Sequence, residues 1–83
     1  MMVTVRLFAR AKDLAGREVI YVELTDGATV AHLRQAIIRA FPKLTELLRR
    51  SAIAVAGDFA TDATSLLPEQ EIAILPPVSG GIC

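Results

Sequence analysis

The sequence has few of the residues that build disulfide frameworks, metal centres or aromatic cores. Its 83 residues include one cysteine, one histidine and no tryptophan, and aromatic side chains make up 5% of the chain. A single cysteine excludes an internal disulfide, and no Cys/His cluster has the spacing of metal ligands, so we expect no metal site. The absence of a disulfide framework favours a reducing compartment, and we expect a cytoplasmic protein.

Net charge and long apolar runs are also absent. Nine basic and nine acidic side chains give a formal net charge of zero, which argues against a nucleic-acid partner because phosphate binding needs a clustered positive field. No apolar run approaches the roughly 18 residues that span a bilayer, and the first residues alternate too early for a signal peptide. We therefore expect a soluble protein that binds neither nucleic acid nor membrane.

The chain is rich in aliphatic residues instead. Hydrophobic side chains make up 53% of the sequence, which suits a short chain that buries only about 60% of its unfolded surface. We expect residues 1–77 to form one domain and residues 78–83 to form a flexible C-terminal tail.

Alternating apolar residues predict strands in both halves of the chain. Val3 to Leu7 and Val19 to Leu24 have this pattern and should pair as an antiparallel hairpin, with residues 11–16 as the connection. Ile53 to Ala56 and Glu71 to Leu75 predict two further strands. A turn at Gly57-Asp58 and a loop or edge strand over residues 60–65 should lie between them.

Helical spacing predicts one main helix after a turn at Asp26-Gly27. Thr29 stands where an N-cap hydroxyl is expected, and Pro42 should end the helix near Ala40 or Phe41. Its apolar face consists of Val30, Leu33, Ile37 and Phe41, and one further short turn is expected around Leu44, Leu47 and Leu48. His32 should face solvent rather than act in catalysis, because no nucleophile accompanies it.

The element order predicts an α+β fold of the β-grasp (ubiquitin-like) class. The first and last strands must lie adjacent and parallel if a single main helix is to cover one face of a mixed sheet of four to five strands. The predicted core is Val5, Leu7, Ile20, Val22, Leu33, Ile37, Ile53, Val55, Ile72 and Ile74.

The last residues are suited to entering a narrow channel. Gly80 and Gly81 lack side chains that would clash with channel walls, and Pro76 and Pro77 stiffen the root of the tail in an extended form. A terminal Gly-Gly pair alone is also typical of a frayed chain end.

Several segments of the chain resemble the small subunit of molybdopterin synthase, within the MoaD/ThiS sulfur-carrier family. The similarity is carried by Val5 to Arg10, Leu14-Ala15-Gly16, Thr29-Val30 with Leu33, and above all Glu71 to Gly81. Thiamine-type carriers share the Gly-Gly end but are usually shorter and generally lack the approach Pro76-Pro77-Val78-Ser79.

The resemblance implies a carrier subunit rather than an enzyme. An adenylating partner of the ubiquitin-activating type would use ATP to activate the carboxylate of Gly81, and a sulfur donor would convert the acyl-adenylate into a thiocarboxylate. The carrier itself would bind no cofactor. The large synthase subunit would take up Pro76, Pro77, Val78, Ser79 and Gly80 so that the sulfur at Gly81 reaches the pterin precursor of molybdopterin. Phe8 and Leu75 fall where such subunits present an apolar surface to the partner, with Lys12 nearby.

The sequence departs from the family pattern at its end, because Ile82-Cys83 follow Gly81. Three interpretations are open: the bond between Gly81 and Ile82 is cut, as by the JAMM-type zinc peptidases that process some sulfur carriers; the dipeptide is retained and the protein is an inactive or binding-only form; or Cys83 acts as a thiol of its own. The pathway is also open, since a carrier for thiamine, cysteine or a secondary metabolite, or a ubiquitin-like protein modifier, would share the fold.

Overall fold

The computed structural model describes residues 1–77, and residues 78–83 lie outside the described part. Five strands form one sheet: β1 (Met2–Leu7), β2 (Val19–Glu23), β3 (Ala52–Val55), β4 (Asp58–Ala60) and β5 (Glu71–Leu75). Three α-helices and one 3-10 helix complete the fold: α1 (Ala9–Ala15), α2 (Val30–Ala40), η1 (Pro42–Leu44) and α3 (Thr45–Arg50).

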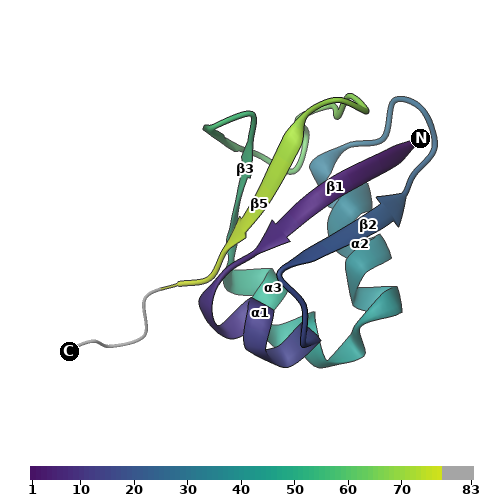
Figure 1. Cartoon of the computed structure of the whole chain (residues 1–83). Coiled ribbons are helices and arrows are strands. Elements are labelled where there is room, and N and C mark those ends of the chain that lie inside the picture. Colours follow the sequence, from purple (N-terminus) through teal and green to yellow (C-terminus); the bar gives the residue numbers. More distant parts are fainter. Residues whose placement is uncertain (78–83) are drawn as a thin grey trace.

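The strand order β2-β1-β5-β3-β4 places the two ends of the domain side by side. β1 and β5 pair in parallel, with Leu7 opposite Ile74, while the β1–β2, β3–β5 and β3–β4 pairs are antiparallel. Figure 1 shows β1 and β5 running side by side towards the end of the sheet where the chain leaves β5. The predicted β-grasp arrangement with adjacent, parallel first and last strands is confirmed.

The core lies between the sheet and α2, and it is aliphatic as predicted. All ten predicted core residues are buried. The structure adds residues from the ends of the sheet and from the segments that close them, namely Val3, Leu24, Val30, Leu44, Leu47, Leu48 and Leu66. Burial of branched aliphatic side chains, worth about 1.5–3 kcal/mol each, is therefore the main stabilising term in this small domain.

The start of α2 has a reciprocal cap in which the histidine takes part. Thr29 is the N-cap residue, as predicted, and its side chain and that of His32 form a capping box. The Thr29 N–H donates to Nδ1 of His32 at 3.0 Å. His32 is exposed, as expected, and this bond gives it a structural role that the sequence pattern did not indicate.

The connection predicted over residues 11–16 is wrong, because Ala9–Ala15 forms the helix α1. Gly16 ends this helix in the left-handed region with φ +73°, and its N–H donates to the carbonyl of Lys12. α1 has only seven residues and buries Ala11 alone. A helix of two turns with one small buried residue has too little apolar periodicity to be predicted from the sequence pattern.

The turn predicted at Gly57-Asp58 is displaced by one residue. The pairing of Val55 with Asp58 makes Ala56-Gly57 a two-residue hairpin turn, so that Asp58 begins the edge strand β4. Both turn residues have positive φ, +52° for Ala56 and +87° for Gly57, as a type I′ turn requires. Alanine is an unusual residue there because its Cβ opposes the left-handed conformation.

The Ala56→Asn variant should therefore be more stable than the wild type. Asparagine adopts positive φ more readily, and Asn-Gly is the preferred type I′ pair, so we expect a gain of about 0.5–1 kcal/mol in the free energy of unfolding. Urea titration followed by circular dichroism measures it. Ala56→Val is the matched control and should be destabilised, since a β-branched residue tolerates positive φ poorly; an Asn variant no more stable than the wild type would contradict the assigned turn.

Candidate protein-docking face

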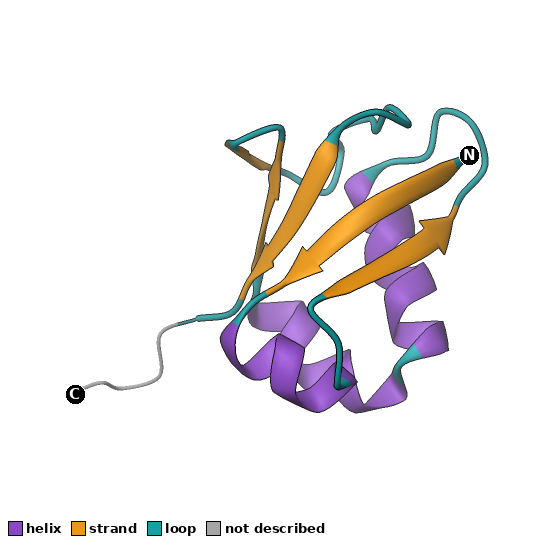
Figure 2. Ribbon diagram, viewed as in Figure 1, coloured by secondary structure: helices purple, strands orange, loops and turns teal. Residues whose placement is uncertain are grey.

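One face of the sheet is not covered by helices. In Figure 2, α2 lies behind the sheet, while α1 and α3 lie at the end of the sheet where the chain leaves β5. We call the uncovered side the outer face. Side chains along each strand alternate between the core and the outer face. The side chains on the outer face include the exposed Met2, Phe8, Tyr21 and Phe59.

The outer face carries an apolar area next to the root of the tail. Phe8 directly follows Leu7, which pairs with Ile74, so the parallel register places Phe8 alongside Leu75. Leu75 in turn pairs with Ala52 of β3. Phe8 is 42% exposed, Leu75 is half-buried, and Pro76 and Pro77 follow immediately. The structure thus brings together two of the three residues that the family resemblance suggested for the partner interface.

Backbone geometry fixes the position of Phe8. Ala9, the next residue, has φ +50°, a left-handed conformation that costs an L-residue about 1–2 kcal/mol. This sharp change of direction separates β1 from α1 and leaves Phe8 at the N-cap of the helix. Strain of this kind persists only where the surroundings enforce it, and it is often found at functional positions.

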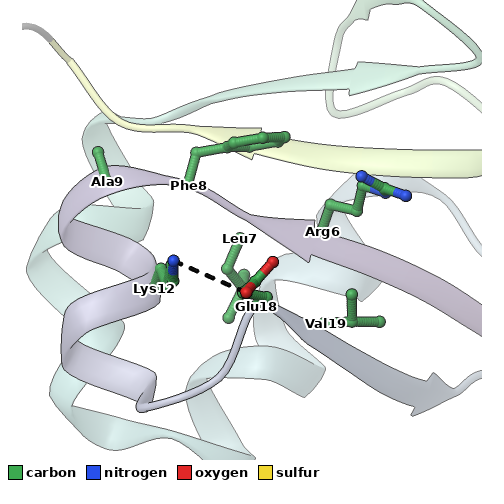
Figure 3. Close-up of a pocket in the computed structure, with 7 residues that line it drawn as sticks. All are labelled: Arg6, Leu7, Phe8, Ala9, Lys12, Glu18 and Val19. Carbon is green, nitrogen blue, oxygen red and sulfur yellow. Dashed lines mark ion pairs between the residues drawn. The ribbon is translucent and has the colours of Figure 1, made fainter.

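Lys12 lies beside the same area, on α1. It lines a shallow hollow of about 170 Å³ together with Phe8, and Figure 3 shows the two side chains on either side of the strand end. The complete lining is Arg6, Leu7, Phe8, Ala9, Lys12, Glu18 and Val19. Lys12 Nζ lies 3.8 Å from Glu18 Oε2. The hollow is smaller than the roughly 300 Å³ at which small-molecule sites begin, so it suits a partner's side chain better than a free ligand.

Phe59 is an exposed aromatic residue that the sequence pattern did not single out. It is 78% exposed and pairs with Ala54, which places it on the outer face. Because Ala54 pairs with Ala73 of β5, two small side chains separate Phe59 from the centre of the sheet. The displaced turn explains the omission, since the face of residue 59 follows only from the correct hairpin register.

An ion pair lies on the same face, between the two exposed aromatic residues of β2 and β4. Arg6 Nε lies 2.7 Å from Glu71 Oε2, with both side chains more than half exposed. Exposed pairs of this kind contribute little to stability.

Metal-ligand groups and membrane-spanning helices were not found among the described residues. Within residues 1–77, no group of three or more His, Cys, Asp or Glu side chains is placed to hold a metal ion. No helix in that range is long and apolar enough to cross a membrane. The predicted tail residues Val78, Ser79, Gly80 and Gly81, and the predicted cleavage position at Gly81-Ile82, lie outside the described residues.

Curated proteins of similar length resemble the chain throughout. The molybdopterin synthase sulfur carrier subunit of Chlamydomonas reinhardtii is 34% identical over 83 residues, covering 98% of this chain and 100% of that protein. The Arabidopsis thaliana subunit of the same name is 32% identical over 79 residues, covering 95% and 82%. These names agree with the expectation of a carrier subunit rather than an independent enzyme.

Solved structures share the fold. SAMP1 from Haloferax volcanii superposes with a TM-score of 0.87 at 26% identity, covering 98% of this chain and 100% of that one. The small archaeal modifier protein 1 of Methanosarcina acetivorans gives a TM-score of 0.77 at 26% identity, covering 96% of each chain. A chain from the complex of subunits 1 and 2 of the molybdopterin-converting factor of Helicobacter pylori gives 0.69 at 32% identity, covering 98% and 100%.

The family assignment rests on a match that runs through the predicted tail. The model of the ThiS family matches residues 5–81, from the first strand to the second glycine, and leaves only Ile82-Cys83 at the C-terminal side. With this match and relatives more than 30% identical over almost the whole chain, the chain belongs to the ThiS family.

Proposed function

We propose that the protein is the sulfur carrier subunit of a molybdopterin synthase and works through Gly81. The observation that carries the proposal is the family match, which ends at Gly81. The tail root, Pro76-Pro77, follows the central strand β5 and lies beside the apolar area of the outer face. Relatives that bear the name of this subunit cover the same length. The fold thus supplies a rigid body that presents one chain end to other proteins.

The chemistry begins at the carboxylate of Gly81. That carboxylate attacks the α-phosphorus of ATP on an adenylating enzyme, pyrophosphate leaves, and an acyl-adenylate forms. Hydrosulfide released by a sulfur donor then attacks the acyl carbon, the bond to AMP breaks, and a thiocarboxylate remains on Gly81. The ionised sulfur is a stronger nucleophile than a carboxylate oxygen at neutral pH, so the carrier can deliver it to the pterin precursor. This chain contributes the acyl group, and its partners contribute the catalytic residues and bind the ATP.

The outer face suits the large synthase subunit. A homologous chain occurs in a complex of subunits 1 and 2 of the converting factor, and interfaces of this kind centre on buried aromatic anchors. Phe8 and Phe59 are exposed aromatic residues on the outer face, and Leu75 lies between them beside the tail root. We assign the anchoring role to these three residues, with Lys12 at the rim.

The proposal requires that Ile82-Cys83 be removed. In the encoded chain the carboxyl group of Gly81 is a peptide carbonyl, which cannot be adenylated. A peptidase of the JAMM type, acting between Gly81 and Ile82, would expose it. The chain ending at Gly81 is therefore the working form.

Reconstitution with purified partners tests this proposal. Incubated with the adenylating enzyme of the host, ATP and a sulfur donor, the chain ending at Gly81 should gain about 16 Da, as one oxygen is replaced by the sulfur nucleophile. The full chain ending at Cys83 should keep its mass under the same conditions. A matched variant ending at Gly80 controls for nonspecific activation. The adenylating enzyme must first be shown to be active on a carrier that it is known to activate. If the mass of the form ending at Gly81 then stays unchanged, the proposal is contradicted.

A second candidate function is conjugation to other proteins. The likeness to the small archaeal modifier protein 1 favours it, with a TM-score of 0.77. In this case the same acyl-adenylate would pass to the amino group of a lysine, forming an isopeptide bond with Gly81. Digests of host proteins would then contain lysines that carry the C-terminal remnant of this chain. Their absence while the thiocarboxylate accumulates would exclude the modifier function in favour of sulfur transfer.

A further inference from the structure

The edge strand β2 directs backbone hydrogen-bonding groups away from the sheet. Figure 2 shows β2 at one edge of the sheet, where β1 is its neighbour. Across this pair the amino group of Met1 donates to the Leu24 carbonyl, and the Leu24 N–H donates to the Met1 carbonyl. Alternate residues of an antiparallel strand bond to the same neighbour. The N–H and carbonyl groups of Val19, Tyr21 and Glu23 therefore point to the outer edge of the sheet.

β2 lacks the features that usually protect an edge strand from pairing. Natural edge strands are often very short, or they carry proline, lysine or a bulge. The five residues Val19–Glu23 include neither proline nor lysine, and their continuous register with β1 excludes a bulge. The other edge strand, β4, has three residues. β2 is therefore the edge of the described sheet that is better suited to the addition of a strand.

Two side chains of opposite charge flank this edge. Arg17 precedes β2 and Glu23 ends it, and both are exposed. Neither side chain forms an ion pair with another residue of the range 1–77. Because the cation stands at one end of the strand and the anion at the other, the edge is complementary in charge to an antiparallel copy of itself.

We propose that β2 pairs with β2 of a second copy of this chain, antiparallel about a two-fold axis at Ile20. In this register Val19 lies opposite Tyr21 of the second copy, and their outward N–H and carbonyl groups form reciprocal hydrogen bonds. Arg17 lies opposite Glu23 of the second copy, so that an ion pair closes each end of the interface. Pairs of a β-branched with an aromatic residue, and of opposite charges, are both favourable across strands.

The charges select this register over its neighbours. A shift of the second copy by two residues would set Tyr21 opposite itself and Glu23 opposite Val19, which removes the direct pairing of Glu23 with Arg17. A shift by one residue would set outward backbone groups against inward ones, and reciprocal hydrogen bonds would not form. Both sides of the interface are therefore specified by one sequence, as a two-fold dimer requires.

The dimer leaves the tail roots uncovered. The tail root follows β5, which β1 separates from β2. Because the two copies are antiparallel, their tail roots lie at opposite ends of one continuous sheet. The inference goes beyond the proposed function and does not depend on it. An interface of one strand pair is smaller than the roughly 1,200 Å² of stable complexes, so the dimer should be weak and reversible.

Sedimentation equilibrium of the full chain tests the inference, with a reducing agent present so that Cys83 forms no disulfide between copies. The wild type should show a reversible monomer–dimer equilibrium with a dissociation constant of about 100 µM. Arg17→Glu and Glu23→Arg should each weaken the dimer about tenfold, because each sets like charges opposite one another. The combined variant Arg17→Glu/Glu23→Arg should return to within about threefold of the wild type, since it restores both ion pairs.

Asp58→Arg is the matched control. It changes the net charge as Glu23→Arg does, but on the other edge strand, and the dissociation constant should stay within about twofold of the wild type. Circular dichroism verifies that each variant is folded. The Tyr21 N–H should also exchange with solvent more slowly at about 1 mM than at about 10 µM protein, because pairing protects it.

A wild type that remains monomeric up to about 1 mM would overturn the inference. So would a combined variant that stays as weak as the single ones, a loss for Asp58→Arg equal to that for Glu23→Arg, or exchange of the Tyr21 N–H that does not depend on concentration. The mass change at Gly81 tests the sulfur-carrier proposal independently of these results.

Discussion

Replacing Phe8 with aspartate should weaken binding of the large synthase subunit by at least about 100-fold, which corresponds to about 2.7 kcal/mol. Phe8 lies beside Leu75 at the tail root and lines the hollow at the end of β1. Aspartate removes the aromatic anchor and adds a carboxylate that must lose its hydration when the complex forms. Isothermal titration calorimetry with the large subunit measures the loss.

The fold should tolerate this substitution. The Phe8 side chain is 42% exposed, and residue 8 is the N-cap of α1, a position that aspartate favours. Tyr21→Asp is the matched control, because Tyr21 is a more exposed aromatic residue, 68% exposed, on the outer face at the edge strand β2. The affinity of the Tyr21→Asp variant for the large subunit should change less than threefold. Equal losses for the two variants would contradict the placement of the docking area at the tail root.

The second large effect concerns stability, and it arises from Arg34. Its guanidinium donates to the carbonyl oxygens of Leu48 and Ser51 and to the carboxylate of Asp62, joining α2 to the end of α3 and to the loop before β5. The Arg34 side chain is 21% exposed, so water replaces these bonds poorly. Arg34→Ala should therefore lower the free energy of unfolding by about 3 kcal/mol.

Urea unfolding of three variants separates this network from a general effect of charge. Arg34→Lys keeps the positive charge but lacks the several N–H donors of the planar guanidinium group. We expect its free energy of unfolding to fall by about half as much as that of Arg34→Ala. Arg39→Ala removes an exposed arginine from the same helix and should change stability by less than about 0.5 kcal/mol. A loss for Arg34→Ala no larger than that for Arg39→Ala would show that the three bonds do not stabilise the fold.

The sequence predicted the parts of the fold that depend on strong local patterns. The alternation of apolar residues around Val5 and Ile72 predicted two strands, and both residues are fully buried. Their pairing was predicted because one helix has to cover one face of a single sheet. The apolar stripe of α2 was equally clear. The ten predicted core residues were correct because aliphatic periodicity reports burial directly.

The remainder depends on contacts that no local pattern encodes. The register of the β3–β4 hairpin depends on a turn formed by Ala56 and Gly57, both with positive φ. This register places Phe59 on the outer face. Arg34 bonds to residues 14, 17 and 28 positions away, which the sequence alone does not relate to one another.

The candidate site divides in the same way. The carrier chemistry at Gly81 was implied by the family resemblance, and so were the interface roles of Phe8, Lys12 and Leu75. The fold adds the reason for their proximity, since a parallel β1–β5 pair must end at one edge of the sheet. Phe59 was added by the structure.

The mass of the C-terminal peptide of this protein, recovered from host cells that are making molybdenum cofactor, tests whether the protein carries sulfur on Gly81. We expect a peptide that ends at Gly81, with a fraction about 16 Da heavier because it carries a thiocarboxylate sulfur. A peptide that ends uniformly at Cys83 in those cells would contradict it.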